Sequence, residues 1–362
     1  MKNFAINTLI FIVTSLILFA LAELGVRIFY KDSTVLFPRY HTDVKYGDFV
    51  IRRIKPNSIF WHTSIDGRWK FTTNSAGFRN YKDFSYEKPK NVYRVLSIGD
   101  SHTQGYEVRQ EYTFSAIAEK YLKKHNINAE VLNTGVSGFS TAEELVFLEN
   151  EGYKYQPDAV ILGFFANDYE DNLKANLFKL DQNGKLIVNK RTHIPGVRIQ
   201  NFIYHLPFVK WLGENSYFYS VLFNGTWAYF KKRLAKNASE KNLEYAVSTR
   251  ENFTQYQEDL TAKLIERMYQ FCKQHDIKLI ILDIPQVHNQ NQSYTSLTPN
   301  LLKTVSHNSD KYFTTDMLFS DYNGIVQLNV PHGHRHISEF THAVLGVSAA
   351  KYLLNNMPPE SF

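Results

Sequence analysis

The chain has 362 residues, of which 44% are hydrophobic and 21% are charged. This balance is that of a folded globular protein and excludes a disordered chain. The net charge of +6 is spread along the sequence without a dense block of Lys and Arg, so we expect no nucleic acid partner. Cys272 is the only cysteine, which excludes an intrachain disulfide.

The N-terminus is strongly apolar. Residues 4–22 carry no charge, and nineteen helical residues nearly cross a hydrocarbon core of about 30 Å. "ELGVRIFY" continues the stretch as an amphipathic helix, which favours a retained membrane anchor. The alternative is a cleaved signal peptide, with Lys2 as its basic region and "ALA" at 20–22 as the cleavage site.

An alternation of apolar strands and helices follows an N-terminal part, residues 32–90, that reads as irregular apart from a strand running into a turn at Asn74–Gly77. Because the strands are continuous apolar runs, the pattern predicts a parallel sheet covered on both faces, an α/β/α sandwich. The predicted strands are 93–98, 129–135, 159–165 and 278–285, and the predicted helices are about 111–125, 141–152, 249–275 and 338–356.

Residues 172–248 interrupt the alternation. They begin with a predicted hairpin around Asp181–Gly184 and continue as an aromatic-rich segment that ends basic. Three interpretations remain open for this insertion: a packed helical subdomain, a lid over a site, or a surface that rests on a membrane beside the N-terminal helix.

A serine stands directly after the first predicted sheet strand, in "LSIGDSHTQG" at 96–105. Ligands of doubly wound sheets bind outside the carboxyl ends of the strands, so Ser101 faces the expected site. The following helix N-terminus would direct backbone N–H groups at an oxyanion. The alternative is that Asp100 and Ser101 only cap a helix.

Two further strand ends carry hydrogen-bond donors. The backbone N–H of Gly138 follows the second strand, and the amide of Asn167 follows the third. Neutral donors beside a serine are the equipment for acyl transfer, and each is worth roughly 3 kcal/mol in such sites. The alternative for Asn167 and Asp168 is an Asx turn.

These residues resemble the four blocks of the SGNH/GDSL hydrolase superfamily in order: "GDS" at 99–101, Gly138, "AND" at 166–168 and a late histidine. "ELGVRIF", "TTNSAGFRN" and "GDSHTQGYEV" resemble its membrane-anchored bacterial branch. The resemblance implies the flavodoxin-like SGNH fold, with Ser101 as nucleophile. It also implies an oxyanion hole built from the N–H groups of Ser101 and Gly138 and the amide of Asn167.

The late histidine lies in "HGHRHISEFTH", residues 332–342. The family pattern assigns the general base to His336, but the acid that usually precedes it by two or three residues is absent, since Gly333 and His334 stand there. A Ser–His dyad, an acid from elsewhere, or weakened activity would each account for this departure. By sequence, the candidate acids are Glu339, Asp321 and Asp283.

A metal site is the competing interpretation of this stretch. His332, His334 and His336 would share one face of an extended strand, and His342 could join them. A stretch that enters a helix from a loop is a poor scaffold for a metal, so we expect neither a metal nor an organic cofactor.

The sequence therefore predicts a serine esterase that uses Ser101, His336, Gly138 and Asn167 on an acyl-carbohydrate or other cell-envelope ester. Alternatives are an O-acyltransferase on an envelope polysaccharide and a non-catalytic binding protein. The partners would be a small-molecule or polysaccharide ester and a membrane, with the catalytic domain anchored on the extracytoplasmic side. The expected domains are an anchor or signal at 1–31, an irregular extension at 32–90, and the hydrolase domain at 91–358 with the insertion at 172–248.

Overall fold

A five-stranded parallel sheet forms the centre of the protein in the computed structural model, which describes residues 2–38, 40–226, 229, 253–289, 292–332 and 336–357. The strands lie in the order β6 (Ala129–Asn133), β5 (Tyr93–Gly99), β7 (Ala159–Phe164), β11 (Lys278–Asp283) and β14 (Lys311–Phe313). The first four agree with the predicted strands, except that β5 ends one residue later and β6, β7 and β11 end one or two residues earlier than predicted.

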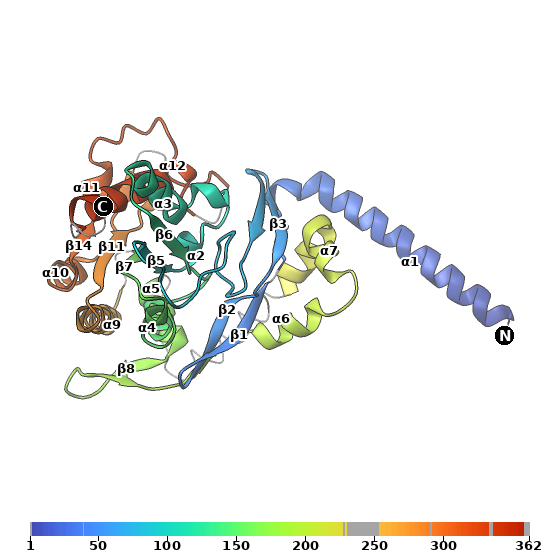
Figure 1. The fold of residues 1–362 in the computed structure, drawn as a ribbon. Helices are drawn as coiled ribbons and strands as arrows, with labels where there is room; N and C mark the ends of the chain where they lie inside the picture. The colour runs from blue at the N-terminus through green and yellow to red at the C-terminus, as the bar shows by residue number, and fades with distance from the viewer. Residues whose placement is uncertain are drawn as a thin grey trace.

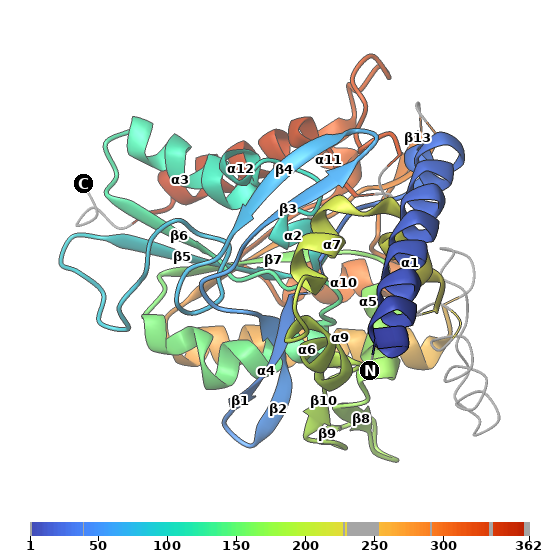
Figure 2. The ribbon, with the colours of Figure 1, turned by 90° about the vertical axis from the view of Figure 1, so that its right-hand side faces the viewer.

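Helices cover both faces of this sheet, as Figure 2 shows. One face packs against α3 (Phe114–Lys124) and α12 (Glu339–Asn355). The other packs against α4 (Thr141–Asn150), α9 (Gln255–Gln274) and α10 (Pro299–His307). Successive residues of β5 enter opposite cores, Val95 the first and Leu96 the second, as the two-residue period of a strand requires. The predicted α/β/α sandwich is confirmed.

The extension at 32–90, expected to be irregular apart from one strand that runs into a turn at Asn74–Gly77, contains two antiparallel hairpins. The expected strand and turn are present, with Gly77 N–H donating to Asn74 O at 3.0 Å, but the irregular structure expected before them was wrong. One pairs β1 (His41–Tyr46) with β2 (Phe49–Ile54), and the other pairs β3 (Ile59–Ser64) with β4 (Gly67–Thr72). Their inward side chains, among them Ile51 and Phe60, belong to the same core as α4 and α9. These strands are stabilised by the burial of their inward apolar side chains in that core. Because none of the four is a long apolar run, the sequence alone did not indicate all of them.

The described part of the insertion combines strands and helices. The predicted hairpin is present as β8 (Phe178–Leu180) and β9 (Leu186–Val188), with Asp181 accepting hydrogen bonds from the N–H groups of its turn. Next come β10 (Thr192–His193), which pairs with β2, then α6 (Val197–Tyr204), α7 (Val209–Asn215) and helical residues 217–226. Its last part lies outside the described residues.

The N-terminal helix α1 (Lys2–Phe29) projects from the body of the molecule (Figure 1). Its segment Asn3–Phe29 is long and apolar enough to cross a membrane, and its apolar window is not buried. A signal sequence has the same properties, so anchor and signal both remain open.

Candidate active site

Ser101 begins the short helix α2 (Ser101–Gln104) directly after β5. The turn between them needs Gly99, because an L side chain at its φ of +152° would clash with Oγ1 of Thr103. Asp100 caps α2, since its carboxylate accepts from the N–H of His102 at 2.8 Å. The capping interpretation is therefore right for Asp100, and it leaves the Ser101 hydroxyl available for other contacts.

Gly138 lies in the loop that follows β6, the strand beside β5. Two hydrogen bonds hold this loop against the Ser101 turn: Val136 N–H to Gly99 O at 3.0 Å, and Ser137 N–H to Gln104 Oε1 at 2.6 Å. Gly138 has a φ of +79°, and a Cβ there would come within 2.9 Å of Nη1 of Arg52. Only glycine accommodates this close approach without moving the guanidinium.

Asn167 follows β7, the strand on the other side of β5. Its amide Nδ2 donates to Oδ2 of Asp100 at 3.2 Å and to Oδ2 of Asp171 at 3.0 Å. The residue therefore lies beside the serine turn, as predicted. Because its two amide protons already have acceptors, donation to an oxyanion requires one of these bonds to be released.

Buried carboxyl groups lie behind the serine turn. Burial raises the pKa of Asp100 to about 7, with the Asp171 carboxylate adding to the rise. Burial also raises the pKa of Glu144 and of Asp168 well above the ordinary value, and each neighbouring carboxylate reinforces the effect. Both effects favour the protonated form of these carboxyl groups, since several adjacent buried negative charges are costly.

His336 completes a hydrogen-bonded pair with the serine: its Nε2 lies 2.8 Å from Oγ of Ser101. The backbone fixes the histidine, because its C=O accepts from Val330 N–H at 2.8 Å and the next residue bridges to Asn329. Its ring packs against Tyr106 at 4.5 Å between ring centroids. Ser338 caps α12, since its Oγ accepts from the N–H of Thr341.

The other described histidines of the stretch point to separate partners. His332 pairs with Asp66 at 2.8 Å, and buried His342 accepts from Phe114 N–H at 3.1 Å through Nδ1. Among the described residues no group of three or more His, Cys, Asp or Glu side chains could hold a metal ion. His334 lies outside the described residues, and the described histidines of the stretch do not form the metal site that was the competing interpretation.

Two of the three candidate acids are engaged elsewhere. Glu339 binds the guanidinium of Arg109, with Nε to Oε1 at 2.8 Å. Asp283 accepts from the N–H groups of Ser296 and Thr315 at 2.7 and 2.8 Å. Neither carboxylate is assigned to orient His336, because each one accepts hydrogen bonds from another part of the chain. Asp321 is exposed on the segment after α11 (Thr315–Phe319).

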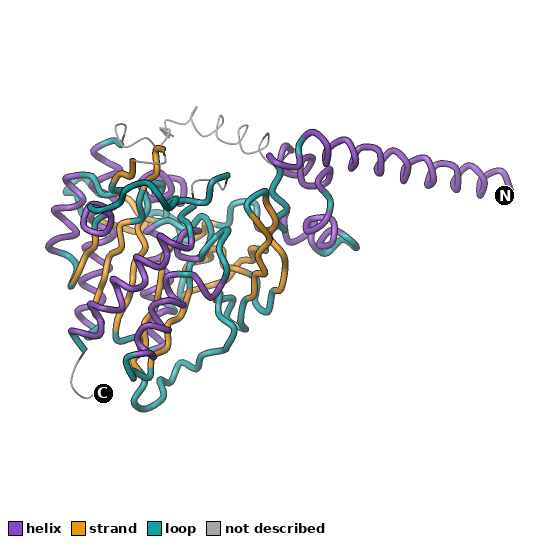
Figure 3. Tube along the Cα trace, turned by 90° about the horizontal axis from the view of Figure 1, so that it is seen from above, coloured by secondary structure: helices purple, strands orange, loops and turns teal. Residues whose placement is uncertain are grey.

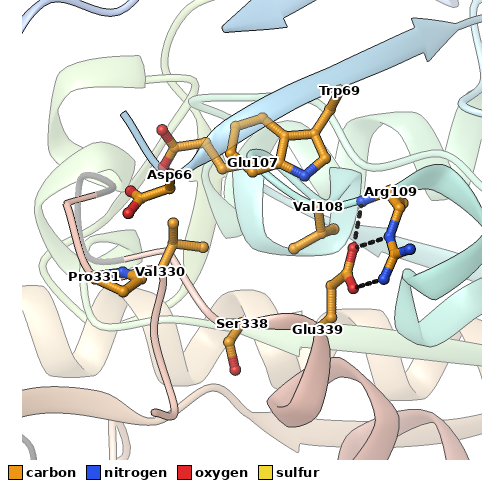
Figure 4. A pocket seen from close by; sticks show the side chains of 9 residues that line it. All are labelled: Asp66, Trp69, Glu107, Val108, Arg109, Val330, Pro331, Ser338 and Glu339. Carbon is orange, nitrogen blue, oxygen red and sulfur yellow. Dashed lines mark hydrogen bonds and ion pairs between the residues drawn. The ribbon is translucent and has the colours of Figure 1, made fainter. Parts of the chain in front are cut away.

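A pocket of about 360 Å³ lies along the chain segments that flank the Ser–His pair (Figure 4). Its lining side chains come from β3–β4 and its turn, from the residues after α2 and from both sides of His336: Asp66, Trp69, Glu107, Val108, Arg109, Val330, Pro331, Ser338 and Glu339. Burial raises the pKa of Glu107 to about 7, and the Asp66 carboxylate adds to the rise. An indole ring beside carboxyl groups suits a ligand with both apolar faces and hydroxyl donors.

Sequence reasoning missed this pocket. Asp66 and Trp69 belong to the extension at 32–90, in which no site residue was predicted, and Glu107, although it lies within the motif "GDSHTQGYEV", was not singled out as a site residue. The "DG" pair at 66–67 and the polar–apolar alternation of "RWKF" at 68–71 were the available signal, since they indicate a hairpin; its turn lies at Ile65–Asp66.

No protein-family model and no curated protein sequence matches the chain significantly. Among solved structures it is similar to a lipase/acylhydrolase from Enterococcus faecalis, with 14% identity, a TM-score of 0.43 and coverage of 74% of this chain and 98% of that one. It is also similar to the esterase EstA from Pseudoalteromonas sp. (12% identity, TM-score 0.38, 73% and 99% covered).

An acetylxylan esterase from Geobacillus stearothermophilus gives 14% identity, a TM-score of 0.39 and coverage of 72% and 93%. Because these identities and TM-scores are low, we infer function from the site itself. The ordered motifs, the parallel sheet and the Ser101–His336 pair together resemble the SGNH/GDSL hydrolase superfamily.

Proposed function

We propose that the protein is a serine-dependent ester hydrolase that forms an acyl-enzyme on Ser101. The observation that carries the proposal is the 2.8 Å contact between Oγ of Ser101 and Nε2 of His336. This distance lies within the hydrogen-bond reach of a general base and its nucleophile.

In the first half of the reaction, His336 removes the hydroxyl proton while Oγ attacks the ester carbonyl. The N–H groups of Ser101 and Gly138 are the donors for the resulting oxyanion, and Asn167 joins them when its amide leaves Asp100 or Asp171. Collapse of the tetrahedral intermediate breaks the ester C–O bond, and the leaving alcohol takes the proton from His336. His336 then deprotonates a water molecule, whose attack on the acyl-enzyme releases the carboxylic acid and restores Ser101.

The proposal uses a Ser–His dyad, since Glu339 and Asp283 serve other partners. The packing of the His336 ring on Tyr106 and the backbone bonds around it supply the orientation that an acid would otherwise give. The substrate class we propose is an acyl-carbohydrate, because the adjacent pocket offers Trp69 as a stacking surface and carboxyl groups as hydroxyl acceptors. We also propose that α1 anchors the protein in a membrane, with the catalytic domain extracytoplasmic.

Labelling with a fluorophosphonate probe tests the nucleophile. Wild-type protein and Ser137→Ala, a control for another serine of the same loop cluster, should be labelled, while Ser101→Ala should not. The absence of labelling in wild-type protein would favour a non-catalytic binding protein instead.

An O-acyltransferase would use the same residues, and the pocket favours it as the second candidate because its walls include residues on both sides of His336 in sequence, 330–331 and 338–339, and offer carboxyl groups to a hydroxyl-bearing acceptor. A polysaccharide acceptor that consumes the acyl donor faster than water does, with acylated acceptor as product, would establish the transferase.

A further inference from the structure

A polar contact fastens α1 to the inserted segment. The Glu23 carboxylate accepts hydrogen bonds from the N–H groups of Tyr217 and Phe218 at 3.1 and 2.9 Å and from Oγ of Ser216 at 2.8 Å. Arg27, one turn later on α1, binds Glu23 at 2.7 Å. These bonds satisfy the backbone donors at the start of helical residues 217–226, so α1 and the insertion form one unit there.

The position of Glu23 in the sequence determines where this contact lies relative to the hydrocarbon core of a bilayer that α1 crosses. It is the first charged residue after Lys2, and about 20 apolar helical residues cross a hydrocarbon core of about 30 Å. A bilayer crossed by residues 4–22 therefore ends near Glu23. Phe19 packs edge-on against Phe218 at 5.6 Å, which brings the insertion to the end of that apolar stretch.

The insertion exposes large apolar side chains close to this contact. α6 packs on β1 with Val197 and Gln200 buried, and α7 buries Val209. Both helices lie on the side of the molecule from which α1 projects (Figures 1 and 3). We name as the apolar face six exposed apolar side chains from α6, from the segment between α6 and α7, from α7 and from residues 217–226: Ile199 (59% exposed), Phe202 (71%), Leu206 (47%), Phe208 (79%), Trp211 (60%) and Leu222 (57%).

The charged side chains that α6 and α7 expose to solvent have one sign. The exposed charged side chains of α6 and α7 are Arg198 and Lys210, both cationic. Glu214, the acid of α7, is partly buried. Apolar and aromatic side chains with a cationic border are the composition of helices that lie in a membrane interface, and anionic headgroups attract such a border.

We propose that the apolar face lies in the headgroup–acyl boundary of an anionic bilayer, the same bilayer that α1 crosses. The proposal rests on α1 as a membrane span and is independent of the chemistry at Ser101. The Glu23 contact holds the apolar face at the level where the hydrocarbon ends. The face and α1 together fix the orientation of the sheet, and with it the Ser101–His336 pair, relative to the membrane.

The test uses the full chain reconstituted in vesicles of phosphatidylcholine and phosphatidylglycerol. A Cys272→Ala background carries one new cysteine, Phe208→Cys or, as the matched control, Ile325→Cys, whose native side chain is 80% exposed on the segment after α11. Each is labelled with an environment-sensitive fluorophore. Lipids with a nitroxide near the headgroup should quench most of the fluorescence at 208 and little at 325, and aqueous iodide should do the reverse.

Equal quenching by lipid at both positions would overturn the proposal. Excimer formation by a pyrene label at 208, without lipid quenching, would also overturn it, because a second copy of the chain would then cover the face. Arg198→Glu combined with Lys210→Glu gives a further readout: it should reduce lipid quenching at 208 in anionic vesicles and leave neutral vesicles unchanged. An unchanged signal in anionic vesicles would refute the part assigned to charge.

Discussion

The interaction between Ser101 and His336 predicts that their contributions to catalysis are not independent. At 2.8 Å, Nε2 accepts the proton that Oγ must lose before it attacks, so both side chains serve one step. A general base contributes roughly 10²–10⁴-fold. At 1.36 kcal/mol for each factor of ten, His336→Ala should raise the barrier by about 3–5 kcal/mol. In Ser101→Ala the histidine has no proton to remove, so the second substitution should cost almost nothing more.

The assay is kcat/KM for p-nitrophenyl acetate in the wild type, both single variants and the double variant. The double variant should hydrolyse the ester at about the rate of Ser101→Ala, as expected for groups that act as a unit. His332→Ala is the control. The His332 imidazole binds Asp66 and not Ser101, so this variant should keep most of the activity. Equal melting temperatures would exclude unfolding as the cause. If the double variant had a kcat/KM below that of Ser101→Ala by the same factor that His336→Ala loses on its own, the two side chains would act independently and the reasoning would be refuted.

Three further outcomes follow from the site. Burial raises the pKa of Glu144, so the folded state retains a proton that the unfolded state loses, and stability should fall as pH rises from the unfolded pKa through the folded one. Glu144→Gln should therefore lose less melting temperature than wild type between pH 5 and pH 9, and equal losses would contradict this. His334→Asp, which restores a carboxylate two residues before His336, should raise kcat at least about tenfold, and an unchanged kcat would exclude the missing acid as the limit. Trp69→Ala should raise KM for an acetylated oligosaccharide and leave p-nitrophenyl acetate hydrolysis unchanged; equal effects on both would remove the stacking role.

The central sheet was predictable because its strands are buried on both faces. A continuous apolar run such as 159–164 has one stable environment, between two layers of helices, and the ends of adjacent strands then meet. The proximity of Ser101, Gly138 and Asn167 follows from that arrangement. His336 was located through the family pattern and not through periodicity.

The contacts of these residues were less predictable. The Asn167 amide donates to the carboxylates of Asp100 and Asp171. No rule of sequence spacing predicts that the amide forms these hydrogen bonds when no substrate is bound. Likewise, Glu339 was a candidate acid by sequence distance, but a guanidinium 230 residues away binds it. Long-range partners of charged side chains depend on the packing of whole elements, which local patterns do not encode.

Under the proposed function, the hairpin β3–β4 would take part in recognition and not in the chemistry. Asp66 and Trp69 enter the pocket from a segment that ends before β5 begins, while the serine, its donors and the histidine all follow strands of the sheet or precede α12. Substitutions in the hairpin turn can therefore change which alcohol is accepted without disturbing the reacting atoms. Related proteins with a different hairpin at this place would be expected to share a reaction but not a ligand, and grafting such a hairpin is a direct route to a new specificity.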